Sequence, residues 1–527
     1  MKIEAGGYLS RVAVKFAQQI AIQTAERTLT FDQLRVGANR IGSGTVGLGV
    51  SSGECAGVLA HNRSEVAELW MGLERSGIVR VVLHTHFDMS VHVKTLNETG
   101  ARAMFFDTRF TSAVEAHKHE IKTVEHFIAV GPNPPSWAIP YEAVVKKGRP
   151  EDPRLEVDED SPCCIQLTTG TTGLPKPWIV THRSWQALIL NNLEHLDTFA
   201  PGLPAVGRDD VNLHFHALQW ASGAQTMVPY LLRGAKNIIL DDAAFDPAAI
   251  VGLIEREGVT GAFVPAPMLA PILDVIELSG GIKHRLRRLI VFFATPELLE
   301  RTSRVLGPVW CHGFGSTEQG APVTRLTCHE AAENRRRLGS VWRQISPFLE
   351  IAVVDEHGER VSAGKVGEIV VRSAMSASSY WGQPERTNEA FFPEGWFRPS
   401  DIGYMDEEGF LYYLDRAKDR IRSAAGIVDP HIVESALLRH DAVANCGVVG
   451  FDKNGAQEVV AAVQLKSGVK AGPQLEQAIL QLARGGLAAH EVPGRLIFVQ
   501  DLPTVLGGSK VQREVLQRSL AAMGAHS

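Results

Sequence analysis

The chain has 527 residues, enough for more than one domain, and its net charge of −6 argues against a nucleic-acid-binding surface. Hydrophobic residues make up 45% and charged residues 21%, an ordinary globular composition, and no apolar run approaches the ~20 residues that span a bilayer. The N-terminus has no signal-peptide core and the six cysteines lack metal-ligand spacing, so we expect a cytoplasmic protein with reduced thiols.

Helix and strand patterns alternate from residue 28 to residue 107. Helical spacing covers 31–48, 62–76 and 91–99, with Asn62 as the expected N-cap of the second helix. Short apolar runs at 56–60, 79–83 and 103–106 predict buried strands. This alternation predicts an α/β fold with a parallel sheet and crossover helices.

The strongest local signal follows an acidic, proline-rich linker at 149–160. It reads Thr168-Thr169-Gly170-Thr171-Thr172-Gly173-Leu174-Pro175-Lys176, between apolar runs at 163–167 and 178–180 that predict strands. Glycines let backbone N–H groups turn toward an anion, threonine hydroxyls add donors, and Lys176 adds a positive charge. We therefore predict a polyphosphate-binding loop. A Walker A loop is disfavoured, because no Gly precedes Lys176 and no Ser or Thr follows it; a turn without a ligand is the remaining alternative.

The pattern [ST]-[ST]-G-[ST]-T-G-x-P-K resembles the phosphate-binding loop of the acyl-adenylate-forming (ANL) superfamily of acyl- and aryl-CoA synthetases, peptide-synthetase adenylation domains and luciferases. The family usually has Gly after the Lys, where this chain has Pro177. The resemblance implies a large N-terminal AMP-binding domain, 1–415, of parallel-sheet αβαβα layers with a β-barrel-like part. It also implies a small, mobile α+β C-terminal domain, 416–527, that carries a catalytic lysine.

A helix is expected over 184–196, and two histidines follow in Leu213-His214-Phe215-His216. In the family, an aromatic–His pair here lines the acyl pocket, so the resemblance implies that His216 lines and closes this pocket. Two strand-edge histidines without a ligand role are the alternative. Adenylation domains that take amino acids carry an Asp nearby, and none occurs in 213–223, which disfavours an amino acid substrate.

A strand followed by a turn is expected over 259–268, and another strand over 289–294. The family usually follows the second strand with Gly-Gly-Ala-Pro, against which the adenine and the acyl group lie. This chain instead has Phe292 and Phe293, which makes both of them candidate pocket residues. Either their bulk reshapes the pocket, which favours a hydrophobic or ring-containing acid of specialised metabolism, or this strand has shifted.

A second motif reads Cys311-His312-Gly313-Phe314-Gly315-Ser316-Thr317-Glu318 and resembles the family's [YF]-G-x-T-E. The Phe314 ring suits stacking on adenine, beside Gly313 in the substrate pocket. Thr317 suits donation to the α-phosphate, and the Glu318 carboxylate suits Mg²⁺, a cation that prefers oxygen ligands. Without the resemblance, a turn with no ligand is an equal alternative.

A third motif, 395–401, resembles G-W-[FY]-x-T-G-D, with Pro399-Ser400 in place of Thr-Gly. The Asp401 carboxylate suits two vicinal ribose hydroxyls. A β-hairpin is expected over 404–414 and a charge run over 415–421, which by itself is usually a solvated surface. The resemblance implies that Arg416 reaches ribose or phosphate and that Lys418 is the hinge between the domains.

The last part of the chain predicts helices over 433–438 and 475–482 and strands over 444–449 and 459–465. Near its end, 502–513 resembles L-P-x-T-x-x-G-K-[VI]-x-R, which implies that Lys510 is the catalytic lysine. An ammonium that bridges the acid's carboxylate and the α-phosphate stabilises charge as the bond forms.

The resemblance implies a two-step reaction that uses ATP, Mg²⁺ and coenzyme A. A carboxylate attacks the α-phosphate to give an acyl-adenylate and pyrophosphate; rotation of the small domain then lets a thiol take the acyl group. We expect CoA as the acceptor. Two alternatives remain: a stand-alone adenylating enzyme that loads an acyl carrier protein, and a catalytically lapsed ligand-binding homologue.

Overall fold

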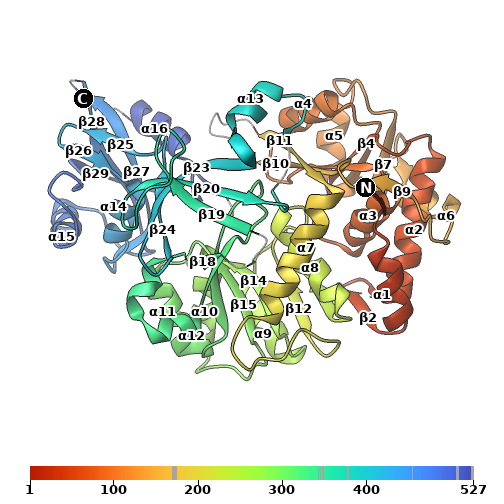
Figure 1. The fold of residues 1–527 in the computed structure, drawn as a ribbon, viewed down its shortest axis with the longest axis horizontal. Coiled ribbons are helices and arrows are strands. Elements are labelled where there is room, and N and C mark those ends of the chain that lie inside the picture. Colours follow the sequence, from red (N-terminus) through yellow and green to blue (C-terminus); the bar gives the residue numbers. More distant parts are fainter. Residues whose placement is uncertain are drawn as a thin grey trace.

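The computed structural model describes residues 1–168, 175–341, 343–344, 346, 349–376, 379–453, 455–505 and 510–523. Figure 1 shows the N-terminal part at the right, the middle of the chain below, and the C-terminal part at the left. A central group of strands, drawn in cyan, lies between these regions. No helix among the described residues is long and apolar enough to cross a membrane.

The first large sheet holds the predicted parallel strands of the N-terminal region. β10 pairs in parallel with β5 and antiparallel with β11, so the predicted phosphate loop begins and ends in this sheet. In spatial order the strands are β21 (Ser379–Tyr380), β11 (Lys176–Thr181), β10 (Pro162–Thr168), β5 (Val79–Val82), β4 (Cys55–Leu59), β6 (Ala103–Asp107), β7 (His126–Val130) and β8 (Ile139–Pro140).

The second large sheet carries the predicted acyl-pocket strands. Neighbours from β2 to β16 pair in parallel, and β17 and β18 extend the sheet antiparallel. In spatial order the strands are β18 (Arg343–Gln344), β17 (Thr324–Thr327), β16 (Trp310–Phe314), β15 (Arg288–Phe292), β14 (Gly261–Pro265), β12 (Val211–His214), β13 (Lys236–Ile239), β2 (Ile20–Gln23) and β3 (Thr28–Thr30).

Helices cover the two large sheets and bury their apolar faces in three extensive cores. The tightest helix pair is α2 with α3, where bare glycines allow close approach: a Cβ on Gly72 would lie 2.4 Å from the Ala38 carbonyl oxygen. The helices are α1 (Tyr8–Phe16), α2 (Phe31–Gly47), α3 (Ser64–Arg75), α4 (Met89–Thr99), α5 (Thr111–His117), α6 (Tyr141–Lys147), α7 (His182–Asp197), α8 (Ala221–Leu232), α9 (Pro247–Arg256), α10 (Ala266–Leu278), α11 (Pro296–Leu306), α12 (Cys328–Glu333) and α13 (Pro384–Glu389).

An antiparallel sheet follows and contains the predicted hairpin at 404–414, which is confirmed. Its strands are β19 (Leu349–Val354), β20 (Gly367–Ser373), β23 (Trp396–Met405), β22 (Phe391–Phe392) and β24 (Leu411–Arg416). The C-terminal part is α+β, as predicted: β27 (Val443–Lys453), β28 (Ala456–Leu465) and β29 (Arg495–Val499) form a sheet beside α14 (Pro430–Leu437), α15 (Pro473–Arg484) and α16 (Arg513–Ala522). Two ribbons, β25 (Ile421–Ser423) with β26 (Gly426–Val428) and β30 (Thr504–Val505) with β31 (Lys510–Val511), complete it.

Two local predictions are wrong. Asn62 does not cap α3, whose N-cap is Arg63; instead the Asn62 side chain donates to the backbone oxygens of His216 and Leu240, tying the two large sheets together. The expected turn after β14 is the start of α10, because Pro267 lies in the first helical turn, where its missing N–H costs nothing.

Glu74 on α3 makes the stability of the N-terminal region depend on pH. Its side chain is buried and accepts a hydrogen bond from Tyr8 Oη at 2.7 Å. Burial raises the pKa of Glu74 from 4.5 to about 7, although the Tyr8 hydrogen bond and the charges of Arg80 and Arg75 oppose this shift. Because the folded state holds a proton that the unfolded state releases, this group's contribution to stability falls as the pH rises from 4.5 through 7.

We expect Glu74→Gln to remove this pH dependence. Relative to the variant, the parent should lose roughly 3 kcal/mol of unfolding free energy between pH 4.5 and pH 8. Urea unfolding of both proteins at several pH values measures the difference. If the unfolding free energies of the two proteins change in parallel with pH, the pKa of Glu74 is the same in the folded and unfolded states.

Candidate active site

The last residue pair of the β10–β11 ladder flanks the predicted phosphate loop. Thr168 pairs with Lys176 at the end of the two strands, as the apolar runs on either side predict. Thr168 Oγ1 is buried and has no hydrogen-bond partner among the described residues, which leaves it available to a ligand. The predicted phosphate contacts Thr169, Gly170, Thr171, Thr172 and Gly173 lie outside the described residues.

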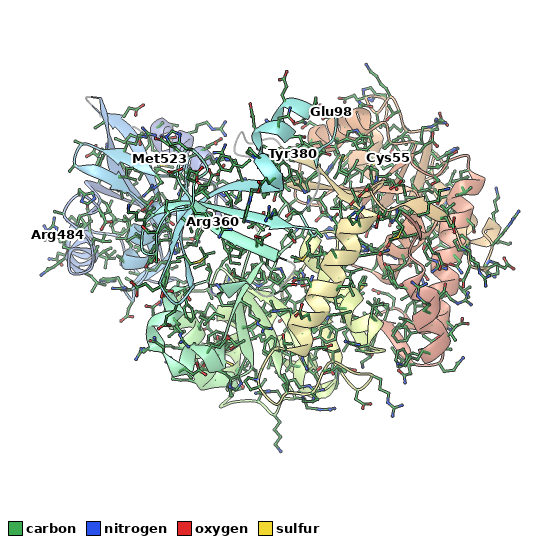
Figure 2. The ribbon with its side chains drawn as sticks, viewed as in Figure 1. Cys55, Glu98, Arg360, Tyr380, Arg484 and Met523 are labelled. Atoms are coloured by element: carbon green, nitrogen blue, oxygen red, sulfur yellow. The ribbon has the colours of Figure 1, made fainter. Side chains whose placement is uncertain are left out.

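Lys176 lies in a cluster of cations beside one carboxylate. Burial lowers the pKa of Lys176, the neighbouring charges of Arg386, Arg416 and Lys418 lower it further, and Glu318 opposes them. Lys176 Nζ also lies 5.7 Å from the centre of the Tyr380 ring. Figure 2 labels Tyr380 near the middle of the molecule, between Cys55 and Arg484. Such a concentration of positive charge attracts a polyphosphate.

The second motif forms a strand followed by a turn. β16 ends at Phe314, whose ring lies 5.5 Å from that of Tyr413, and Gly315 follows with φ 141°, a conformation that side chains rarely adopt. The turn then presents Thr317 and Glu318, and the charge of Glu318 acts on Tyr380 and Arg416 as well as on Lys176. The two motifs, far apart in the sequence, therefore meet at one place.

The third motif joins the same place through the β23–β24 ladder. Asp401 and Arg416 are directly opposite each other in this ladder, with Arg416 Nε 3.6 Å from Asp401 Oδ1. Burial opposes the charge of Arg416, yet Asp401, Tyr413 and Glu318 raise its pKa, so the guanidinium stays positive. A carboxylate and a guanidinium that are held together suit a ribose hydroxyl pair and a phosphate.

The predicted acyl-pocket residues lie at the ends of β12, β15 and β16. The His216 ring lies 4.9 Å from Phe263, and Phe263 lies 5.2 Å from Phe292. Phe292 packs directly on Gly313, where a Cβ would come within 2.6 Å of its ring. Phe293 turns away: it is 50% exposed, with φ 61°. Phe292 is therefore buried against Gly313, whereas Phe293 is half exposed.

Comparison with known proteins identifies this arrangement. Residues 9–381 match the family described as AMP-binding enzyme, and residues 432–506 match its C-terminal domain. The first match alone covers well over half of the chain. The chain belongs to the AMP-binding enzyme family.

Similar family members include CoA ligases. A long-chain-fatty-acid–CoA ligase of Thermus thermophilus is 30% identical over 530 residues, which cover 97% of this chain and 94% of that protein. An indoleacetate–CoA ligase of Aromatoleum aromaticum is 28% identical over 98% of each chain. A crystal structure of an anthranilate CoA ligase in complex with anthranoyl-AMP matches with a TM-score of 0.89 at 23% identity, over 99% of this chain and 98% of that one. This likeness confirms the predicted fold, with large N-terminal and small C-terminal domains.

The predicted hinge of this AMP-binding enzyme contacts the last helix. Lys418 Nζ lies 3.1 Å from Glu514 Oε1 on α16, although its charge also acts on Lys176. The backbone of Lys510 pairs with that of Val505 in the β30–β31 ribbon. The Lys510 side chain lies outside the described residues, and the domain boundary at 415/416 stays a prediction.

Some neighbours of the site were not predicted. Arg386 on α13 acts on Lys176, and Tyr380 and Tyr413 flank Lys176 and Phe314. None of the three belongs to a motif that carries the resemblance, and only the folded chain brings them close to Lys176 and Phe314. Tyr380 is on β21, Arg386 on α13 and Tyr413 on β24, so no local pattern in the sequence links them to the site.

Ser400, which stands where the family motif has a glycine, has a backbone conformation that favours glycine. Its φ is 64°, in the left-handed region, and its carbonyl accepts a hydrogen bond from Ala417 N at 2.8 Å. A non-glycine residue in this region is strained by about 1 kcal/mol. The backbone before Asp401 therefore takes a left-handed turn at Ser400.

We expect Ser400→Gly to raise the unfolding free energy by up to about 1 kcal/mol, since it relieves this strain. Ser362→Gly is the matched control, because Ser362 is exposed and has no positive φ, and it should lower stability by a few tenths of a kcal/mol. Thermal unfolding measures both. Equal shifts in the two variants would show that position 400 is not strained.

Proposed function

We propose that the chain is an ATP-dependent acid–CoA ligase, which activates a carboxylic acid as its acyl-adenylate and transfers the acyl group to CoA. The observation that carries this proposal is the cluster of Lys176, Arg386, Arg416 and Lys418 around Glu318, at the end of the phosphate-loop strands. Membership of the AMP-binding enzyme family and the CoA-ligase names of the relatives support it.

In this proposal Lys176 and Arg416 of the cluster bind ATP together with residues of the other motifs. Asp401 accepts hydrogen bonds from the ribose hydroxyls, Phe314 stacks on the adenine, and Thr317 donates to the α-phosphate. Lys176 and Arg416 neutralise phosphate charge, which otherwise repels the approaching carboxylate. Lys510 bridges the carboxylate and the α-phosphate as the bond forms and pyrophosphate leaves.

Glu318 offers the oxygen ligand that Mg²⁺ prefers, on the side of the cluster where the phosphates lie, so the residues present fit this ion. When bound, Mg²⁺ neutralises charge on the phosphate oxygens and orients the leaving pyrophosphate.

The acid is proposed to be hydrophobic or ring-containing and not an amino acid. Phe292, packed on Gly313, narrows the pocket beside Phe263, and His216 faces it with an uncharged ring, since burial lowers the pKa of His216 to about 3. No carboxylate occurs in 213–223 to pair with a substrate ammonium. Among the relatives, the indoleacetate–CoA ligase is named for a ring-containing acid.

The acceptor is tested directly by offering either free CoA or a carrier protein with its pantetheine arm, together with ATP and an activated acid. We expect a thioester on CoA with the parent and no product with Lys510→Ala. A thioester on the carrier alone would favour the carrier-loading alternative. Equal, background-level pyrophosphate release by the parent and the variant would favour a lapsed enzyme.

A further inference from the structure

His216 lies at the centre of an aromatic wall. Its ring is 4.9 Å from Phe263 and 6.3 Å from Trp220, and Phe263 continues the wall to Phe292. The side chain is only 2% exposed. A planar ring of a substrate fits beside such a wall, because aromatic rings pack favourably in tilted or offset arrangements.

Neither ring nitrogen of His216 has a hydrogen-bond partner among the described residues. The Ser222 backbone lies near the ring and raises its pKa slightly, but it does not meet the distance and angle of a hydrogen bond. The pKa near 3 keeps the ring neutral, with one N–H donor and one bare acceptor nitrogen. By contrast, His214 Nε2 lies 2.8 Å from Asn212 Nδ2 and 3.0 Å from Asn237 Oδ1. An unpaired buried polar ring is costly, so a binding partner is the natural reason for keeping it.

Gln219, three residues after His216, is a second buried polar side chain without a hydrogen-bond partner among the described residues. Its side chain is 1% exposed, and neither Oε1 nor Nε2 has a hydrogen-bond partner among the described residues. Asn62 holds the loop between the two side chains, since it donates to the His216 oxygen at 2.8 Å and accepts from Leu218 N at 2.7 Å. The two unpaired polar groups therefore belong to one rigid loop, as a preorganised binding site requires.

We propose that His216 and Gln219 recognise an uncharged polar group, a hydroxyl, on the ring of the acid, so that the enzyme prefers hydroxylated aromatic acids to unsubstituted ones. This inference rests on the proposed ligase function. A hydroxyl both donates and accepts, which matches the neutral imidazole and the amide. A second carboxylate is disfavoured, because a neutral ring gives it no countercharge in a buried position.

The test compares kcat/KM for acid-dependent pyrophosphate release with pairs of aromatic acids that differ only by a ring hydroxyl. For the parent we expect a preference of at least about tenfold for the hydroxylated acid, since the unsubstituted acid leaves buried polar groups unpaired. In His216→Phe and Gln219→Leu the preference should fall toward one, while the KM for ATP stays unchanged. Phe292→Leu is the matched control: it reshapes the same pocket without removing a polar group, so the preference should persist.

Two results would overturn this inference. One is a parent that releases pyrophosphate with aromatic acids but shows no preference for the hydroxyl, or that accepts only acyclic acids. The other is a preference that both His216→Phe and Gln219→Leu retain. Either result leaves the ligase function standing, whereas a parent that releases no pyrophosphate with any acid would count against that function itself. Melting temperatures of the variants separate lost recognition from lost folding.

Discussion

Replacing Glu318 with glutamine is expected to slow acid-dependent ATP–pyrophosphate exchange by about 10²-fold or more. Glutamine has nearly the same shape but removes the carboxylate whose charge acts on Lys176, Tyr380 and Arg416. If this carboxylate holds Mg²⁺ against the phosphates, its loss weakens charge neutralisation where it is needed. The Mg²⁺ concentration for half-maximal exchange should rise together with the loss of rate.

The control for this change is Glu297→Gln, which removes an exposed carboxylate in the first turn of α11. It should leave both the exchange rate and the Mg²⁺ dependence unchanged. Exchange by Glu318→Gln within threefold of the parent, at the same Mg²⁺ concentration, would show that Glu318 does not hold the metal ion.

Replacing Arg75 with methionine is expected to lower the unfolding free energy by about 3–5 kcal/mol, the usual cost of breaking a buried charged network. The Arg75 side chain is 1% exposed, and its guanidinium donates to Asn39 Oδ1 at 2.8 Å, Gly6 O at 2.9 Å, Ser10 Oγ at 2.7 Å and Asp152 Oδ1 at 2.9 Å. Methionine keeps the bulk but removes all four of these hydrogen bonds; Asp152 Oδ1 keeps its bonds from Arg35 and Asn39, and Gly6 O keeps its bond from Leu9 N. The arginine therefore fastens the N-terminal segment and the linker at 149–160 to α2 and α3.

The first urea transition, followed by intrinsic fluorescence, measures the Arg75 effect. Arg149→Met changes an exposed arginine in the same linker and should shift the transition by no more than about 0.5 kcal/mol. A loss below 1 kcal/mol for Arg75→Met would mean that water replaces the guanidinium at little cost.

The sequence predicted the strands around the phosphate loop because they are short apolar runs flanking a glycine- and threonine-rich segment. The resemblance implied separately that Asp401 binds ribose and that Arg416 reaches ribose or phosphate, and the β23–β24 ladder places the two residues opposite each other. The sequence missed Arg386, because an arginine on a short helix has no local pattern that distinguishes a phosphate neighbour from a surface charge.

The role of Asn62 was wrong for a related reason. A polar residue just before a helix is typically a cap, and only tertiary structure reveals that this one bonds to backbone 154 and 178 residues away. The prolines of Pro265-Ala266-Pro267-Met268 predict a turn, but Pro in a first helical turn is equally compatible with the helix start that the structure has there. The sequence pattern near Asn62 and near Pro267 is compatible with more than one local structure, and only tertiary contacts decide between them.

We propose that the cluster around Glu318 activates a carboxylic acid with ATP. The most direct test is acid-dependent exchange of pyrophosphate into ATP over a panel of fatty, aryl and polycyclic carboxylic acids, repeated with CoA. The account predicts exchange with ring-containing acids, followed by a thioester when CoA is added. Absence of exchange with every acid of the panel, by protein that is folded and binds ATP, would contradict it.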